Sequence, residues 1–181
     1  MNHVPLVYSP PPDEGLEIRH QDGALLVVAK PAGLLAVPGR GPERQDCLAT
    51  RVQARFPGAL VVHRLDLGTS GLLLMALDPD VQRQLGRQFE LRQVEKHYIA
   101  IVAGHLAEGE RTIDLPLIAD WPNRPRQIVD HTIGKPALTR LQVLSYDAAG
   151  DTTRVLLLPE TGRSHQLRVH LQAIGHAILG D

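Results

Sequence analysis

Asp66 is the side chain whose neighbours best suit it to do chemistry. It lies in the segment His63-Arg64-Leu65-Asp66-Leu67-Gly68-Thr69-Ser70-Gly71, whose glycines permit backbone conformations that other residues resist. A carboxylate on such a shaped loop can act as a nucleophile or as a base. An aspartate in a turn rich in Gly, Ser and Thr more often caps or forms that turn, so the segment alone leaves both interpretations open.

Arginines and lysines gather in runs, although the formal net charge is only −1. A nucleic-acid-binding domain is usually basic overall, so composition alone does not indicate one, and any RNA site must be local. A solvated surface is the alternative for each run. The runs are Arg83, Arg87, Arg92 and Lys96, then Arg124, Arg126, Lys135 and Arg140, then Arg154, Arg163 and Arg168.

Metal and thiol chemistry find little support in the sequence. His63, His165, His170 and His176 are the obvious candidate ligands, but no His-Glu-x-x-His or Cys-x-x-Cys pattern accompanies them. We therefore predict no metal. Cys47 is the single cysteine, so it can form neither an internal disulfide nor a thiolate cage, and a buried thiol is the simplest prediction for it.

The elements that must position Asp66 are mostly strands, separated by Gly, Pro and Asp. Asp22-Gly23 favours the positive backbone angles of a tight hairpin turn. Apolar runs and alternation predict strands within residues 16–29, 72–77, 96–103, 111–114, 137–146 and 153–158. This order fits an α+β domain with a mainly antiparallel, mixed β-sheet, a few flanking helices and long loops.

Helical spacing predicts helices that begin and end at recognisable residues. Asp78 and Ser164 are the expected N-caps, Pro79 suits a first helical position, and Pro57-Gly58 and Gly175 end the helices that precede them. The apolar faces are Leu48, Val52 and Phe56 in residues 46–56, then Val81, Leu85 and Phe89 after Asp78, then Leu167, Leu171 and Ile174 in residues 164–174.

Three motifs in this order resemble the RluA family of pseudouridine synthases. The first is the segment around Asp66, the second is Glu95-Lys96-His97-Tyr98-Ile99-Ala100, and the third is Thr161-Gly162-Arg163-Ser164-His165-Gln166-Leu167-Arg168-Val169-His170-Leu171. Other segments are similar to the branch acting on both ribosomal and transfer RNA. They are residues 30–34, 37–40, 114–118, 120–125 and 134–137.

The resemblance implies a role for each motif residue. Asp66 matches the family's catalytic aspartate, and Arg168 matches the arginine that pairs with it, as an ionised carboxylate in a closed pocket requires. Tyr98 matches the tyrosine that stacks on the uracil and can take its C5 proton. Arg64 would fill the gap left by the flipped base, and Leu167 would press on the uracil.

The remaining substrate contacts are less specific. His63 belongs to the first motif. The expected phosphate ligands are Arg40, Arg124, Arg126, Lys135 and Arg163. Trp121 stays unassigned, because a lone tryptophan in a Pro-rich turn packs on its own domain at least as often as it stacks on a base.

The resemblance also implies an isomerase that needs no cofactor, because the reaction includes no redox or phosphoryl-transfer step. Its expected partners are structured RNA, namely hairpin loops of 23S ribosomal RNA and the anticodon stem-loop of tRNAs, with no membrane or protein partner and a monomeric state. Residues 1–12 contain no basic segment followed by an apolar one, and nowhere do about eighteen apolar residues run together, which predicts a cytoplasmic protein.

The domain expected is a single pseudouridine synthase catalytic domain spanning residues 1–181, with no separate N-terminal S4-type RNA-binding domain. Chains of this family normally continue beyond Gly180-Asp181, so we expect a C-terminally shortened domain. The sequence also leaves two other functions open. A two-carboxylate hydrolase such as a glycosidase needs an acidic partner for Asp66, and none falls in the motifs. A non-catalytic RNA-binding protein would keep the arginines without needing Asp66.

Overall fold

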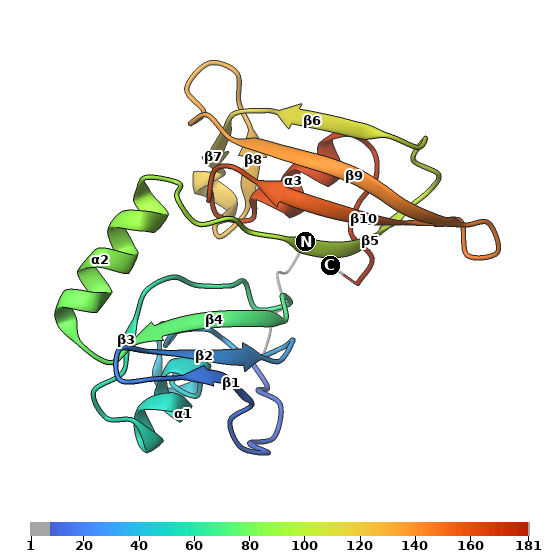
Figure 1. The fold of residues 1–181 in the computed structure, drawn as a ribbon. Helices are drawn as coiled ribbons and strands as arrows, with labels where there is room; N and C mark the ends of the chain where they lie inside the picture. The colour runs from blue at the N-terminus through green and yellow to red at the C-terminus, as the bar shows by residue number, and fades with distance from the viewer. Residues whose placement is uncertain (1–7, 181) are drawn as a thin grey trace. The chain divides into compact units, whose positions relative to one another are not determined.

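The computed structural model describes residues 8–180, and the chain divides between Gln93 and Val94 into two compact units (Figure 1). Residues 1–7, which belong to the N-terminal stretch without a leader pattern, and Asp181 lie outside the described residues. Each unit combines α-helix with antiparallel sheet, which confirms the predicted α+β fold. In the described part of the chain, none of the helices has the length and apolar character needed to cross a membrane.

The sheet of the first unit has the strand order β1-β2-β4-β3. Its strands are β1 (Ile18–Gln21), β2 (Leu25–Lys30), β3 (Leu60–Val61) and β4 (Gly71–Ala76), all antiparallel to their neighbours. The Asp22 side chain accepts hydrogen bonds from the backbone N–H groups of Ala24 and Leu25 at 2.7 and 2.9 Å. The hairpin predicted at Asp22-Gly23 is therefore confirmed, whereas β3 is too short to be read from alternation.

Helix α1 (Leu48–Arg55) covers one face of this sheet, and a short 3-10 helix, η1 (Pro42–Arg44), precedes it. Leu48 and Val52 share a buried core with Leu26, Leu73 and Met75. Cys47 is fully buried, as predicted, and it also caps the helix, because its Sγ accepts from the Thr50 backbone N–H at 3.4 Å.

Helix α2 (Pro79–Glu90) begins where the sequence predicts it. Asp78 is its N-cap, with Oδ1 accepting from the backbone N–H groups of Asp80 and Val81 at 2.7 and 3.3 Å. The predicted stripe of Val81, Leu85 and Phe89 is half-buried.

Replacing Asp78 with alanine is expected to lower the free energy of unfolding by about 1 kcal/mol, because the first N–H groups of α2 lose their acceptor. Urea denaturation followed by circular dichroism measures this loss. Gln84→Ala, an exposed change in the same helix, serves as control and should shift stability by less than about 0.5 kcal/mol. Equal unfolding curves for the two variants would contradict the capping role.

The sheet of the second unit has the strand order β5-β10-β9-β6. Its strands are β5 (Tyr98–Ala103), β6 (Glu110–Asp114), β9 (Leu138–Asp147) and β10 (Thr152–Pro159), and β7 (Leu117–Ala119) and β8 (Gln127–Val129) form a separate hairpin around the 3-10 helix η2 (Trp121–Asn123). Burial alternates along β10, so Val155 and Leu157 face the core with Leu171 of helix α3 (Gln166–Ala173).

The start of α3 differs from the sequence prediction. His165, in the left-handed conformation with φ of 54°, is the N-cap, so the prediction of Ser164 as N-cap is wrong. The Gln166 side chain causes the difference, because its Oε1 accepts from the Arg163 backbone N–H at 2.9 Å and holds the preceding turn. The apolar face of Leu167, Leu171 and Ile174 is confirmed, and Gly175 follows the helix with a positive φ of 87°.

Candidate active site

Asp66 lies on a loop whose backbone is fixed on both sides. Leu65 is buried, Asp66 itself is half-buried, and the Thr69 backbone N–H donates to the Asp66 carbonyl at 3.1 Å. The Gly33 backbone N–H donates to the Leu67 carbonyl at 2.9 Å. The segment that carries the carboxylate is thus held in one conformation by hydrogen bonds.

Lys30 is a candidate functional residue that the sequence prediction missed. Its side chain is only 1% exposed, and Nζ donates to the carbonyls of Pro31, Leu34 and Leu67 at 2.9, 2.6 and 3.2 Å. An ammonium group has three hydrogens to donate, so all are satisfied. The cation therefore ties the turn after β2 to the residue that follows Asp66.

The environment of Lys30 acts on its charge in two opposing ways. Burial lowers the pKa of Lys30 from 10.5 to about 8, while the negative charge of Asp66 works to raise it. A buried charge is stable only when it is paired or hydrogen-bonded. Lys30 thus supplies positive charge to the Asp66 carboxylate from within the same unit.

His63, predicted to contact substrate, is also part of the framework of the first unit. Its Nε2 accepts from the Leu74 backbone N–H at 3.0 Å, so that nitrogen carries no proton. The ring stacks on Phe89 of α2 with centroids 4.7 Å apart. These contacts join the segment before Asp66 to β4 and α2.

The third motif of the second unit is organised by Gln166, whose side chain is buried. Its Oε1 accepts from the Thr161 hydroxyl at 2.7 Å, in addition to the Arg163 N–H. Its Nε2 donates to the Leu138 carbonyl and to the Thr139 Oγ1, both at 3.0 Å. All four hydrogen-bonding positions of the amide are used, which fixes the start of α3.

His170 continues this network one turn further along α3. Its Nε2 is 3.0 Å from the Leu115 carbonyl, which only accepts, so Nε2 carries the proton. Nδ1 then accepts from the Thr139 hydroxyl at 3.0 Å. Burial lowers the pKa of His170, which favours this neutral form. The orientation of α3, and with it of Leu167 and Arg168, depends on these bonds.

The predicted residues of the second and third motifs all lie in the second unit. Tyr98 opens β5 opposite Leu157 and is half-buried, and Leu167 packs against the core. Arg168 is half-buried on α3, and Arg163 donates from Nε to the Pro136 carbonyl at 3.1 Å. Asp66 belongs to the first unit, so the pairing of Asp66 with Arg168 stays a prediction.

The other predicted arginines are exposed. Arg64 and Arg40 lie in the first unit, on the Asp66 segment and on the loop before α1. Arg124 lies in the second unit, after η2, with its guanidinium 4.0 Å from the centroid of the Trp121 ring. All three side chains are placed where a phosphate could reach them, and their phosphate contacts stay predictions.

Three of the four candidate metal ligands have hydrogen-bond partners within their own unit. His63 binds Leu74, His170 binds Thr139 and Leu115, and His176 Nδ1 is 2.8 Å from the Ala103 carbonyl. Within residues 8–180, no group of three or more His, Cys, Asp or Glu side chains is arranged to hold a metal ion.

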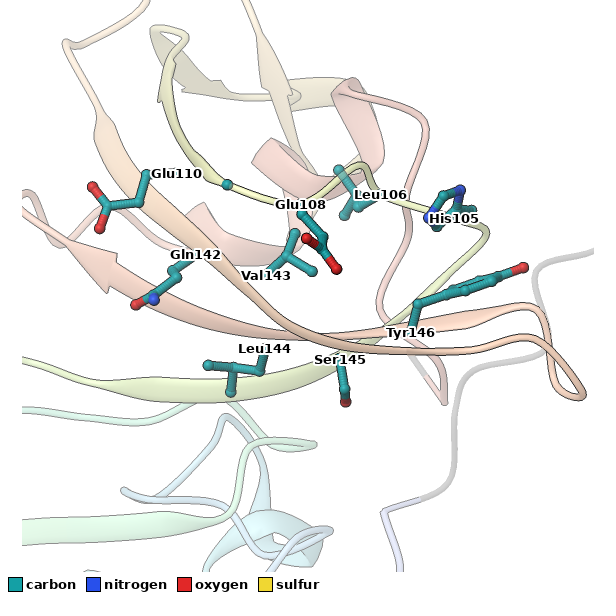
Figure 2. Close-up of a pocket in the computed structure, with 10 residues that line it drawn as sticks. His105, Leu106, Glu108, Glu110, Gln142, Val143, Leu144, Ser145 and Tyr146 are labelled. Carbon is teal, nitrogen blue, oxygen red and sulfur yellow. The ribbon is translucent and has the colours of Figure 1, made fainter.

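A hollow of about 500 Å³ in the second unit, drawn in Figure 2, contains none of the predicted site residues. Its walls come from β9 and the segment before β6, and the His105 ring lies against Tyr146 with centroids 4.2 Å apart. Glu108 and Glu110 line it, and their carboxylates would repel an RNA backbone. We therefore do not assign RNA to it.

Comparisons with known proteins agree on one family. A family model described as RNA pseudouridylate synthase matches residues 24–173. The Escherichia coli K12 protein named dual-specificity RNA pseudouridine synthase RluA is 53% identical over 174 residues, which are 96% of this chain and 79% of that protein. The Yersinia pestis protein of the same name is 57% identical over 164 residues, which are 91% and 79% of the two chains.

Solved structures give the same result. The structure titled human RNA pseudouridylate synthase domain containing 1 aligns with a TM-score of 0.79 and 36% identity, covering 96% of this chain and 71% of that one. Human RNA pseudouridylate synthase domain containing 4 aligns with a TM-score of 0.73 and 30% identity, covering 91% and 67%.

Proposed function

Because this chain belongs to the RNA pseudouridylate synthase family, we propose that it isomerises selected uridines of structured RNA with Asp66 as its catalytic carboxylate. Membership makes it a pseudouridine synthase, which is an isomerase. The observation that carries the assignment of Asp66 is the set of hydrogen bonds that fixes the backbone of its loop. Lys30 and Gly33 both donate to the Leu67 carbonyl, and Thr69 donates to that of Asp66.

The reaction breaks the N1–C1′ bond of uridine, rotates the uracil and joins C5 to C1′, so the C5 hydrogen is lost to water. Ionised Asp66 can attack either the sugar or the uracil, and each route begins with the same carboxylate. We assign Tyr98 to stack on the uracil and to accept the C5 proton. We assign Arg168 to pair with Asp66, because a carboxylate closed over by a base requires a compensating cation. No redox or phosphoryl step occurs, so the chemistry requires no cofactor.

The target uridine must leave its stack before it can react, at a cost of a few kcal/mol. We propose that Arg64 occupies the vacated position and that Leu167 presses on the flipped uracil. His63 shapes the start of the same segment through Leu74 and Phe89. Arg40, Arg124 and Arg163 are proposed phosphate contacts, because hairpin RNA is held largely through its backbone.

The proposed substrates are a hairpin loop of 23S ribosomal RNA and the anticodon stem-loop of certain tRNAs. The name of the bacterial relatives, dual-specificity RNA pseudouridine synthase, supports two RNA classes. We propose that the protein acts in the cytoplasm, as a monomer forming one catalytic domain. Mapping pseudouridines in cells lacking the protein tests the substrates, and unchanged sites in both RNA classes would contradict the assignment.

Release of tritium from RNA carrying 5-tritiated uridine is the direct test of the activity. The chain is expected to release tritium from stem-loop RNA in amounts that rise with time and match the pseudouridine formed, because isomerisation exchanges the hydrogen at C5. Bound RNA without release from a cooperatively folded chain would favour the alternative of a non-catalytic RNA-binding protein.

A further inference from the structure

The hairpin of β7 and β8 ends in a tip, residues 120–126, that is closed by its own hydrogen bonds. The Asp120 N–H donates to the Arg126 carbonyl at 2.9 Å, the Asn123 N–H to the Asp120 carbonyl at 3.0 Å, and the Arg126 N–H to the Asn123 carbonyl at 3.1 Å. At the base, Leu117 is buried and exchanges two backbone hydrogen bonds with Lys135. The tip is thus a firmly anchored element.

Trp121 stands on this tip with 65% of its surface exposed. Exposing a ring of this size gives up the apolar burial that aromatic side chains normally provide. Among residues 8–180, the Arg124 guanidinium contacts the ring, 4.0 Å from its centroid. A guanidinium covers one face, so the exposed fraction leaves the opposite face accessible to a planar ligand.

The charges of the tip favour an anion next to that ring. Its carboxylate, Asp120, is largely covered, accepts from Asn123 Nδ2 at 2.9 Å and lies 3.9 Å from Arg126 Nε. Arg124 and Arg126 are both exposed. A phosphate near the tip would therefore meet guanidinium groups, with the one acidic side chain already engaged by its neighbours.

We propose that the exposed face of Trp121 stacks on an unpaired base of the substrate RNA, with Arg124 contacting the adjoining phosphate. This inference rests on the proposed function and adds a base-stacking site to it. Stacked aromatic rings flanked by arginine bind single-stranded nucleic acid without regard to sequence, because every base has a π face. The hydrogen-bonded tip suits this use, because a preorganised loop loses little conformational entropy when it binds.

Trp121 is the single tryptophan of the chain, so its fluorescence reports this site alone. Titration of the parent with a tRNA anticodon stem-loop is expected to quench the emission along the same curve that labelled RNA gives by anisotropy. Trp121→Ala should raise Kd by about 5-fold to 100-fold, the range of one stacked base. Trp121→Phe, which keeps a stacking face, should recover most of this loss.

Leu144→Ala is the matched control, because it removes an exposed apolar side chain of the same unit away from the tip. Leu144→Ala should bind RNA like the parent. In the tritium-release assay, Trp121→Ala should raise KM more than it lowers kcat. Unquenched emission from RNA-bound parent, or parent-like binding by Trp121→Ala, would overturn the stacking site while leaving the proposed function intact. A parent that neither binds RNA nor releases tritium would overturn both.

Discussion

Replacing Asp66 with asparagine is expected to lower kcat for tritium release by at least about 1,000-fold, the scale of losing a residue that takes part in the chemistry. The amide keeps the shape of the side chain but provides neither a nucleophile nor a base. The fold should survive, because hydrogen bonds to the backbone carbonyls of Asp66 and Leu67 hold this loop and do not depend on the carboxylate. RNA affinity measured by anisotropy should change far less than kcat.

Asp22→Asn is the matched control for this prediction. Asp22 lies in the same unit at the β1–β2 turn, and asparagine can still accept from Ala24 and Leu25. The control should release tritium at the parent rate. Parent-like release by Asp66→Asn, with the control equally active, would remove Asp66 from the catalytic role and require a different carboxylate.

The sequence predicted the elements that depend on local signals. Asp22-Gly23 and Asp78 specify their turn and cap through their own side chains, and both appear as expected. The α3 N-cap was placed wrongly because Ser164 is a good local cap, whereas the Gln166 side chain reaches back to Arg163 from a buried position. The position of the Gln166 side chain is fixed by its hydrogen bonds to Leu138 and Thr139 of β9, which are distant in sequence.

In the candidate site, too, residues in local motifs were predicted and a residue whose contacts are distant in sequence was missed. Asp66 and Arg168 could be predicted as site residues because each lies in a contiguous motif. Lys30 was missed as a functional residue, yet the alternation of β2 contains the signal. Leu26, Val28 and Lys30 lie on the same buried face with a period of two residues. A lysine at the buried position of a strand needs acceptors, but only the folded loops reveal that the Leu67 carbonyl is one of them.

Replacing Lys30 with methionine is expected to reduce kcat by about 100-fold, the scale associated with a catalytic group misplaced by roughly 1 Å. Methionine fills similar volume, but it donates no hydrogen bond to the Leu67 carbonyl and places no positive charge near Asp66. Lys30 is a positioning residue here, because it acts on the substrate only through Asp66. The free energy of unfolding should also fall, because the carbonyls of Pro31, Leu34 and Leu67 lose their donor, so kcat is compared under conditions where both proteins are folded.

The dependence on pH separates this role from a merely structural one. Burial lowers the pKa of Lys30 from 10.5 to about 8, so above about pH 8 the native protein gives up a proton that the unfolded chain keeps. The contribution of Lys30 to the stability of the parent therefore rises between about pH 8 and 10.5, because the unfolded state keeps the Lys30 proton there. Activity should fall over the same range, because the ammonium near Asp66 is lost. Lys30→Met should remove both the rise in stability and the fall in activity above about pH 8.

Val28→Ala is the control, because Val28 is buried on the same face of β2 two residues earlier. It should lower the free energy of unfolding by about 1–3 kcal/mol through the cavity it leaves, while keeping the alkaline loss of activity. A loss of activity in the parent while its stability relative to Lys30→Met rises cannot come from unfolding, since an unfolding protein loses both together. If Lys30→Met keeps parent activity and the same decline above pH 8, Lys30 would be a structural residue alone.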